Sequence, residues 1–307
     1  MTKVLVATDK PFAAEAVTAI KKICVEAGFE FALLEKYTEV SQLLDAVKDV
    51  DGMIIRSDLV TAEVLDAANN LKIVVRAGAG YDNIDLAAAT AHNVVAMNTP
   101  GQNANAVAEL AIGMMIYYAR GLFNGKPGTE LKGKTLGVHA FGHVGRQVAK
   151  LAKAFDMNVF AFDPYISEAD RAKYDVTFLG THEALYAACQ YVSVHIPATA
   201  ETKTSINYEL LSSMPKGAVL INTARKEVVN EADLLRVFEA RPDFGYVSDV
   251  APDCAADIAD KFPGRFYFTP KKMGAQTEEA NVNAGIAAAQ QIERFIKKGD
   301  RTFQVNK

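Results

Sequence analysis

The sequence has no tryptophan, little cysteine and no long hydrophobic run. Its three cysteines, Cys24, Cys189 and Cys254, are an odd number without metal-binding spacing, which argues against a disulfide framework and for a reducing compartment. No run approaches the ~18 apolar residues of a transmembrane helix. Residues 1–8 form a short strand pattern without the apolar core or cleavage site of a signal peptide. These absences predict a cytoplasmic protein with no membrane partner.

An excess of charge of one sign is also missing. Lys and Arg number 33 against 37 Asp and Glu, which gives a net charge of −4 and an isoelectric point near 5.8. This balance gives no reason to expect a nucleic-acid partner. Half of the residues are hydrophobic and 23% are charged, as in soluble globular proteins. The length of 307 residues predicts roughly two domains.

Short apolar runs alternate with helical patterns along the whole chain. Such alternation predicts the α/β class, with two doubly wound parallel sheets covered by helices. A long helix at 104–120 and a turn-rich loop at 121–128 separate the two alternations. Strands are predicted at 4–7, 31–34, 53–55, 73–75, 94–97, 136–139, 159–162, 191–196, 219–222, 246–250 and 266–269, and further helices at 13–27, 41–47 and 278–297.

A glycine-rich turn follows the strand at 136–139. The sequence from Leu136 to Gly145 ends an apolar run in a turn and begins a helix, an arrangement that suits the pyrophosphate of a dinucleotide. Asp163, 18 residues after Gly145, suits the adenine ribose hydroxyls and disfavours the 2′-phosphate of NADP. Ala140 replaces the first glycine of the usual G-x-G-x-x-G pattern, which is tolerable if φ stays negative there. The turn predicts an NAD site, and an ordinary tight turn is the alternative.

Arginines follow three predicted strands, where open parallel sheets bind their ligands. Arg56 follows 53–55, and Arg76 follows 73–75 at a second glycine turn. Together they suit a phosphate or carboxylate, although each alone could be a solvated surface residue. Arg225 follows 219–222 and could bind a substrate carboxylate and polarise its carbonyl, with a structural ion pair as the alternative.

Two lysines and one histidine are acid–base candidates. Lys271 and Lys272 follow the last predicted strand, and an ammonium there could protonate the carbonyl oxygen of a 2-oxo acid. In the oxidative direction its pKa must fall, and arginines and partial burial act in that direction. The alternative is a solvated pair in a loop. His195 follows an apolar run, where an acid–base role, a cofactor contact and a core hydrogen bond are all open.

Taken together, these segments resemble the D-isomer-specific 2-hydroxyacid dehydrogenases over nearly the whole chain. The resemblance is strongest to the branch that acts on phosphoglycerate, in its short form without a regulatory domain. It implies a Rossmann-type NAD-binding domain, 99–276, inserted in a flavodoxin-like substrate-binding domain, 1–98 plus 277–307. It also implies a homodimer formed through the helix at 104–120. The matching segments are 54–57, 76–85, 98–100, 130–137, 194–197, 222–225 and 248–250.

The family's pattern implies roles for individual residues. This chain departs from it at the acid–base pair, because Cys254 stands where the family has glutamate and a lysine stands where it has histidine. Alignment back from Gly274 favours Lys272, whereas alignment forward from Pro270 favours Lys271. The implied catalytic residues are Arg225, Lys272 and Asp253 (as the group orienting Lys272); the substrate-binding residues are Arg56, Ser57, Arg76 and Gly78; and the cofactor-binding residues are Gly142, His143, Val144, Gly145, Asp163, His195, Pro197, Thr202, Ala224, Asp249 and Gly274. No metal site is expected.

The resemblance implies NAD-dependent oxidation of D-3-phosphoglycerate to 3-phosphooxypyruvate, the first step of serine synthesis. A second hypothesis keeps the chemistry and changes the substrate, to D-lactate, D-glycerate or hydroxypyruvate and glyoxylate. Arg56 discriminates between them, because an unphosphorylated substrate needs no second arginine. A third hypothesis is an NAD-sensing binding protein with little turnover, since the glutamate–histidine pair is missing.

Overall fold

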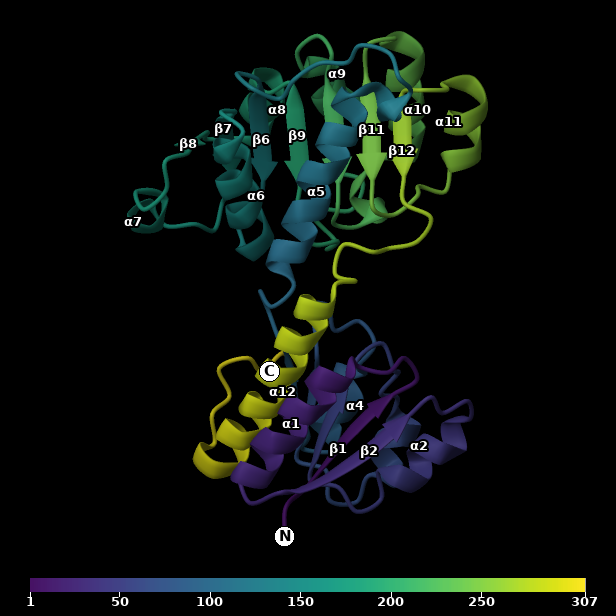
Figure 1. The fold of residues 1–307 in the computed structure, drawn as a ribbon, viewed down its shortest axis with the longest axis vertical. Coiled ribbons are helices and arrows are strands. Elements are labelled where there is room, and N and C mark those ends of the chain that lie inside the picture. The colour runs from purple at the N-terminus through teal and green to yellow at the C-terminus, as the bar shows by residue number, and fades with distance from the viewer. Residues whose placement is uncertain (307) are drawn as a thin grey trace. The chain divides into compact units, whose positions relative to one another are not determined.

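The computed structural model describes residues 1–306. The chain divides into two compact units: Met1–Asn103 together with the residues from Gln276 onward, and Ala104–Ala275. Each unit is built on one parallel sheet with helices on both faces (Figure 1), so the predicted α/β class with two parallel sheets is confirmed.

The first unit contains a five-stranded sheet in the order β2-β1-β3-β4-β5. Its strands are apolar at consecutive positions because both faces are buried: Val4 and Val6 face one core, and Leu5 and Ala7 face the other. The elements are β1 (Lys3–Thr8), α1 (Ala14–Glu26), β2 (Glu30–Glu35), α2 (Val40–Ala46), β3 (Gly52–Ile55), α3 (Ala62–Ala67), β4 (Ile73–Arg76), α4 (Leu86–Ala91), β5 (Val95–Asn98) and α12 (Glu278–Lys298).

Both ends of the chain contribute to this unit. The C-terminal helix α12 packs beside α1 (Figure 1). After α12 the chain returns to β5, where Gln304 forms an antiparallel bridge with Met97. The buried amide of Asn306 accepts a hydrogen bond from the N–H of Ala96 and donates one to the carbonyl of Val94, both at 2.8 Å. The tail therefore covers the edge of the sheet that β5 would otherwise leave unpaired.

The second unit contains a seven-stranded sheet in the order β12-β11-β10-β9-β6-β7-β8. Six of these strands follow the order of a doubly wound sheet. From β6 the chain adds strands first on one side and then, from β9 onward, on the other, and such sheets bind ligands at this point of change. The elements are α5 (Ala104–Ala119), η1 (Gly121–Phe123), β6 (Thr135–His139), α6 (His143–Ala154), β7 (Asn158–Phe162), α7 (Glu168–Arg171), β8 (Thr177–Phe178), α8 (His182–Ala188), β9 (Tyr191–Val194), α9 (Tyr208–Ser213), β10 (Val219–Asn222), η2 (Lys226–Val228), α10 (Glu231–Ala240), β11 (Gly245–Ser248), α11 (Ala255–Lys261) and β12 (Phe266–Phe268).

The sequence prediction differs from the structure at three strands. β8 was not predicted, since its two residues are too few for a pattern. β9 and β11 each end two residues before the predicted bounds. At β11 the chain turns after the strand, and the hydroxyl of Ser248 accepts the N–H of Val250 at 3.2 Å. After β9, Pro197 has no N–H to continue a ladder.

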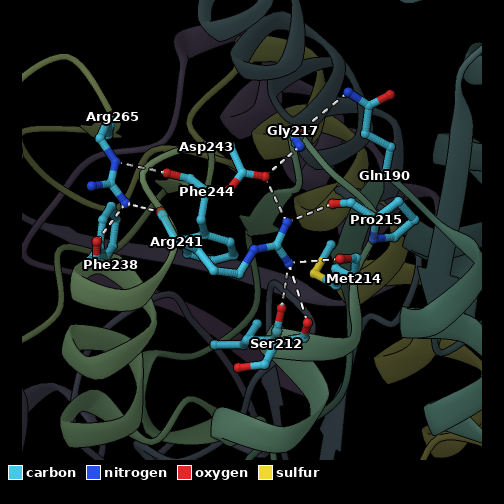
Figure 2. A network of polar contacts seen from close by, with 11 residues as sticks. Gln190, Ser212, Met214, Pro215, Gly217, Phe238, Arg241, Asp243, Phe244 and Arg265 are labelled. Carbon is cyan, nitrogen blue, oxygen red and sulfur yellow. Dashed lines mark hydrogen bonds and ion pairs between the residues drawn. The ribbon is translucent and has the colours of Figure 1, made fainter.

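A polar network joins the segments that lead into β10 and β11 (Figure 2). The Arg241 guanidinium donates to the carbonyls of Met214 at 2.7 Å and Pro215 at 2.8 Å, and to the carboxylate of Asp243 at 2.7 Å. Asp243 also accepts the N–H of Gly217 at 2.7 Å. These bonds, led by the one from Arg241, lower the pKa of Asp243 to about 2. The network lies at the amino ends of these strands and leaves their carboxyl ends to the site.

None of the helices described in residues 1–306 is both long and apolar enough to cross a membrane. The same residues contain no group of histidine, cysteine and carboxylate side chains that could hold a metal ion.

Candidate active site

The glycine-rich turn joins β6 to α6 at the point where the strand order reverses. Gly142 caps the N-terminus of α6, and a Cβ there would meet nothing within 4 Å. At Gly145, in contrast, a Cβ would lie 2.2 Å from the carbonyl oxygen of Ala140. Gly145 thus allows the helix to pack closely on the turn, and Gly142 leaves open space at the helix start, where His143 and Val144 begin α6.

Ala140 does not meet the condition under which the sequence analysis found an alanine tolerable. That condition was a negative φ, but Ala140 has φ +78°. Its N–H still donates to the carbonyl of Phe162 at 2.9 Å, so the chain leaves the β6–β7 ladder only after this residue and must reverse sharply. An L-residue in the left-handed region costs about 1–2 kcal/mol.

Asp163 ties the end of β7 to the same turn. One carboxylate oxygen accepts the N–H of Phe141 at 2.7 Å, and the other accepts the N–H of Tyr165 at 2.8 Å. A carboxylate offers about four acceptor positions, so both oxygens retain capacity for ribose hydroxyls. The open helix start, the close approach at Gly145 and this anchored carboxylate fit the pyrophosphate and adenine ribose of NAD.

His195 follows β9, and its ring lies between two hydroxyl groups. Ser193 Oγ is 3.0 Å from Nε2, and Thr223 Oγ1 is 3.5 Å from Nδ1. Burial lowers the pKa of His195 to about 3, so the ring is neutral at physiological pH. Of the three roles left open for His195, the structure shows the hydrogen-bonded one and gives no support to acid–base work.

The loop after His195 carries two predicted cofactor contacts. Thr202 closes this loop, because its hydroxyl donates to the carbonyl of Pro197 and accepts the N–H of Thr199 at 2.8 Å. Pro197 and Thr202 therefore lie next to each other at the carboxyl edge of the second sheet.

The turn that carries Arg225 is held by a residue to which the sequence analysis gave no role. Asn222, the last residue of β10, accepts the N–H of Ala224 and donates to the carbonyl of Arg225, both at 2.9 Å. The Arg225 guanidinium itself donates to the carbonyl of Ala224 at 3.1 Å. The signal that could have identified Asn222 is a single polar residue at the end of an otherwise apolar strand.

Asp249, just after β11, is fully buried and contacts the loop that follows β12. Its carboxylate accepts the N–H groups of Met273 at 2.9 Å and Gly274 at 2.8 Å, and the hydroxyl of Thr269 at 3.1 Å. A Cβ at Gly274 would lie 2.9 Å from this carboxylate. Lys271 and Lys272 are exposed between these anchors.

The segment that stands in place of the family's glutamate has partners of its own. Asp253 forms an ion pair with Lys226. Its predicted role as the group that orients Lys272 stays a prediction. Glu231 accepts the N–H groups of Asp253 at 2.9 Å and Cys254 at 2.8 Å. Burial and the Glu231 carboxylate raise the pKa of Cys254 to about 12, so this thiol cannot serve as a base near neutral pH.

In the first unit, the predicted substrate residues lie at or just after the carboxyl ends of the neighbouring strands β3 and β4. Arg56 donates to the carbonyls of Lys10 at 2.9 Å and Pro11 at 2.8 Å, and to the side-chain oxygen of Asn281 at 2.7 Å. Three of its five N–H groups are thus engaged within residues 1–306, and two are left for an anion. Ser57 is exposed beside it.

Arg76 and Gly78 are brought together as well. A Cβ at Gly78 would lie 1.6 Å from an Nη of Arg76, so the guanidinium occupies the space that a side chain would take. Arg76 Nε also donates to the carbonyl of Arg56 at 3.2 Å. Asp58, which the sequence analysis missed, fixes this strand end, since its buried carboxylate accepts the N–H of Arg56 at 3.1 Å.

Comparisons with known proteins agree with this geometry. A family model described as the D-isomer specific 2-hydroxyacid dehydrogenase, NAD binding domain, matches residues 117–261. A hydroxypyruvate reductase of Thermotoga maritima is 35% identical over 285 residues, which cover 86% of this chain and 90% of that protein. A D-3-phosphoglycerate dehydrogenase of Methanocaldococcus jannaschii is 34% identical over 275 residues, 83% of this chain. This chain spans about half the length of that relative, 52%, and of similar ones.

A solved structure extends the likeness to the whole chain. The NAD+-bound 3-phosphoglycerate dehydrogenase of Entamoeba histolytica is 45% identical, with a TM-score of 0.88 and coverage of 100% of this chain and 99% of that one. The predicted family and its cofactor, NAD, are confirmed. This protein belongs to the D-isomer-specific 2-hydroxyacid dehydrogenases, and its second unit carries their NAD-binding domain.

Proposed function

We propose that this protein oxidises D-3-phosphoglycerate at its 2-hydroxyl group to 3-phosphooxypyruvate, with NAD as the oxidant. The observation that carries the proposal is the pair Arg56 and Arg76, which lie together at the carboxyl ends of neighbouring strands of the first unit. Two guanidinium groups at one sheet edge suit a substrate that carries a phosphate as well as a carboxylate. The names of the relatives in Methanocaldococcus jannaschii and Entamoeba histolytica support the same substrate.

In this proposal one unit binds the substrate and the other binds the cofactor. The first unit binds the substrate, with Arg56, Ser57, Arg76 and Gly78 around its anionic end. The second unit binds NAD through the predicted cofactor residues, among which Asp163 holds the adenine ribose. When bound, NAD supplies the hydride acceptor.

Arg225 and a lysine perform the chemistry on the substrate side. Arg225 holds the substrate carboxylate and stabilises the charge that develops on the C2 oxygen. Lys272 takes the proton of the 2-hydroxyl group during oxidation and returns it during reduction. The turn held by Asn222 and the loop held by Asp249 support these two side chains.

The homodimer belongs to the same proposal, through α5 and the residues after it. Phe123 is 66% exposed just beyond α5, and its ring packs edge-on against Tyr117. Contiguous exposed apolar surface marks contacts between subunits, and in this proposal Phe123 contributes to such a surface. Light scattering after size-exclusion chromatography measures the subunit number, and a monomer at micromolar concentration would contradict this part.

The test is NAD reduction, followed at 340 nm, with D-3-phosphoglycerate, D-glycerate and D-lactate. Turnover with the phosphorylated acid alone is expected. Gly78→Ala is the sharpest variant, because its methyl group must displace the Arg76 guanidinium. It should raise KM for D-3-phosphoglycerate by about tenfold or more, as the loss of a charge-assisted contact does. Gly180→Ala is the control, since a Cβ there meets nothing within 4 Å.

Hydroxypyruvate reduction is the second candidate. It is favoured by the Thermotoga maritima relative, which matches this chain over 90% of its own length. Equal kcat/KM for D-glycerate and D-3-phosphoglycerate, with no effect of Gly78→Ala on the ratio, would favour this candidate over the first.

A further inference from the structure

The Asp249 carboxylate receives all three of its side-chain hydrogen bonds from a single loop. Its donors, Thr269, Met273 and Gly274, stand on both sides of Lys271 and Lys272. Asp249 has no exposed surface, and a buried carboxylate is stable only when several donors face it. The loop therefore supplies the hydrogen-bond donors that the buried carboxylate needs.

The backbone of Asp249 is fixed as firmly as its side chain. Its N–H donates to the carbonyl of Asn222 at 2.9 Å, and its carbonyl, at 2.8 Å, shares the single hydroxyl proton of Thr269 with the carboxylate. Asn222 in turn holds the turn of Arg225. The carboxylate is thus mounted on the ends of β10 and β11, the rigid part of the unit, while the lysines lie in a loop without regular structure.

We propose that Asp249 is a positioning residue, whose carboxylate fixes the 269–274 loop and thereby the place of the acid–base lysine. This inference rests on the proposed dehydrogenase function and goes beyond the cofactor contact that the family resemblance implies for Asp249. A lysine side chain is long and flexible, so a mobile loop beneath it would lower the fraction of productive geometries.

Asp249→Asn is the decisive change because it preserves shape and removes one acceptor. An amide offers one oxygen and one NH₂ group, so the N–H of either Met273 or Gly274 must then face another donor. Thr269→Val removes only the hydroxyl and is a milder second variant, which keeps the proposal testable if Asp249→Asn does not fold. Asp260→Asn is the control with the same change of charge, because Asp260 is exposed on α11.

The first readout is limited trypsin digestion of the full chain, with mass analysis of cleavage after Lys271 and Lys272. This measurement needs no activity. Asp249→Asn should speed cleavage at these sites by about tenfold or more, and Thr269→Val by less, since each loosens the loop locally. Asp260→Asn should match the wild type, and cleavage at other lysines and arginines should stay unchanged in all variants. Wild-type cleavage rates at Lys271 and Lys272 in both Asp249→Asn and Thr269→Val would overturn the proposal.

The second readout separates positioning from cofactor contact. A positioning role predicts that Asp249→Asn lowers kcat at saturating NAD by about tenfold to a hundredfold, with the NADH dissociation constant within about threefold of wild type. A weakened NADH affinity with unchanged kcat would also overturn the proposal, because it would make Asp249 a cofactor contact alone. If the wild type itself turns over none of the acids, the dehydrogenase function fails, while the digestion still decides whether Asp249 holds the loop.

Discussion

Lys271 and Lys272 are neighbours in one exposed loop, and the proposed function assigns the acid–base role to Lys272. Lys272→Ala should lower kcat by about 10² to 10⁴, the usual contribution of a positioned proton-transfer group, with NADH affinity retained. Lys271→Ala is the matched control and should have little effect. Steady-state rates together with NADH fluorescence titration measure both quantities.

The reverse pattern, with the large loss in Lys271→Ala, would show that the loop aligns with the family forward from Pro270. Wild-type rates in both variants would show that neither lysine is the acid–base group and that both are surface charges. A protein that binds NADH but shows no turnover in any form would support the NAD-sensing hypothesis.

A substitution at Ala140 is expected to increase the stability of the protein. Its φ of +78° suits glycine, so Ala140→Gly should raise the free energy of unfolding by about 0.5–1 kcal/mol, the strain relieved less the added freedom of the unfolded chain. Ala154→Gly, at the exposed end of α6, is the control and should lower it by about 1 kcal/mol or less. Urea unfolding at pH 7 measures both, and a destabilised Ala140→Gly would show that the turn is not strained.

At the scale of elements, the Arg241–Asp243 network should make the second unit sensitive to acid. The pKa of Asp243 is lowered to about 2, so its ionised form is favoured in the folded state. The stability it adds is fully present above its unfolded pKa of about 3.9 and is lost as pH falls through its folded pKa. Asp243→Asn should therefore lower the unfolding free energy at pH 7 by about 1–3 kcal/mol, and the difference from wild type should shrink between pH 4 and pH 2.

Urea unfolding across this pH range is the measurement. Asp260→Asn, on the exposed face of α11, serves as the control and should follow the wild type at every pH. A difference between Asp243→Asn and wild type that stays constant down to pH 2 would mean that the network is not governed by this carboxylate.

The elements were largely predictable from sequence, but the contacts that position side chains were not. Buried parallel strands are apolar at every position, which is why runs such as 53–55 and 219–222 were found. Arg56 shows the limit, because its partner Asn281 lies 225 residues away and no local pattern connects them. Asp249 was assigned from a motif, but its three bonds to one loop depend on how β11 and β12 pair. Asp58, in turn, was missed because a buried aspartate beside an arginine has no periodic signature.

At the scale of the whole molecule, the C-terminal tail should stabilise the first unit. Asn306→Ala removes the amide that bonds to Ala96 in β5 and to Val94 just before it, both buried, and leaves those two backbone groups unsatisfied. Hydrogen exchange at Ala96 should become faster, corresponding to a loss of about 1–3 kcal/mol in local stability. Lys298→Ala, exposed in the last turn of α12, is the control, and unchanged exchange at Ala96 in Asn306→Ala would contradict a role for the tail.

The first unit is formed by two segments that are separated in the sequence by the second unit, so these two segments are synthesised at different times. A ribosome makes β1 to β5 first, then the whole of the second unit, and only then α12 and the tail. Translation proceeds at roughly 5–20 residues per second. For many seconds, therefore, the face of the nascent sheet that α12 will cover and the edge formed by β5 are exposed. The second unit is continuous and can complete its fold in that interval. During translation, therefore, the strands that are made before the second unit are completed only after it, and we expect chaperones that bind exposed apolar surface to bind them in that interval.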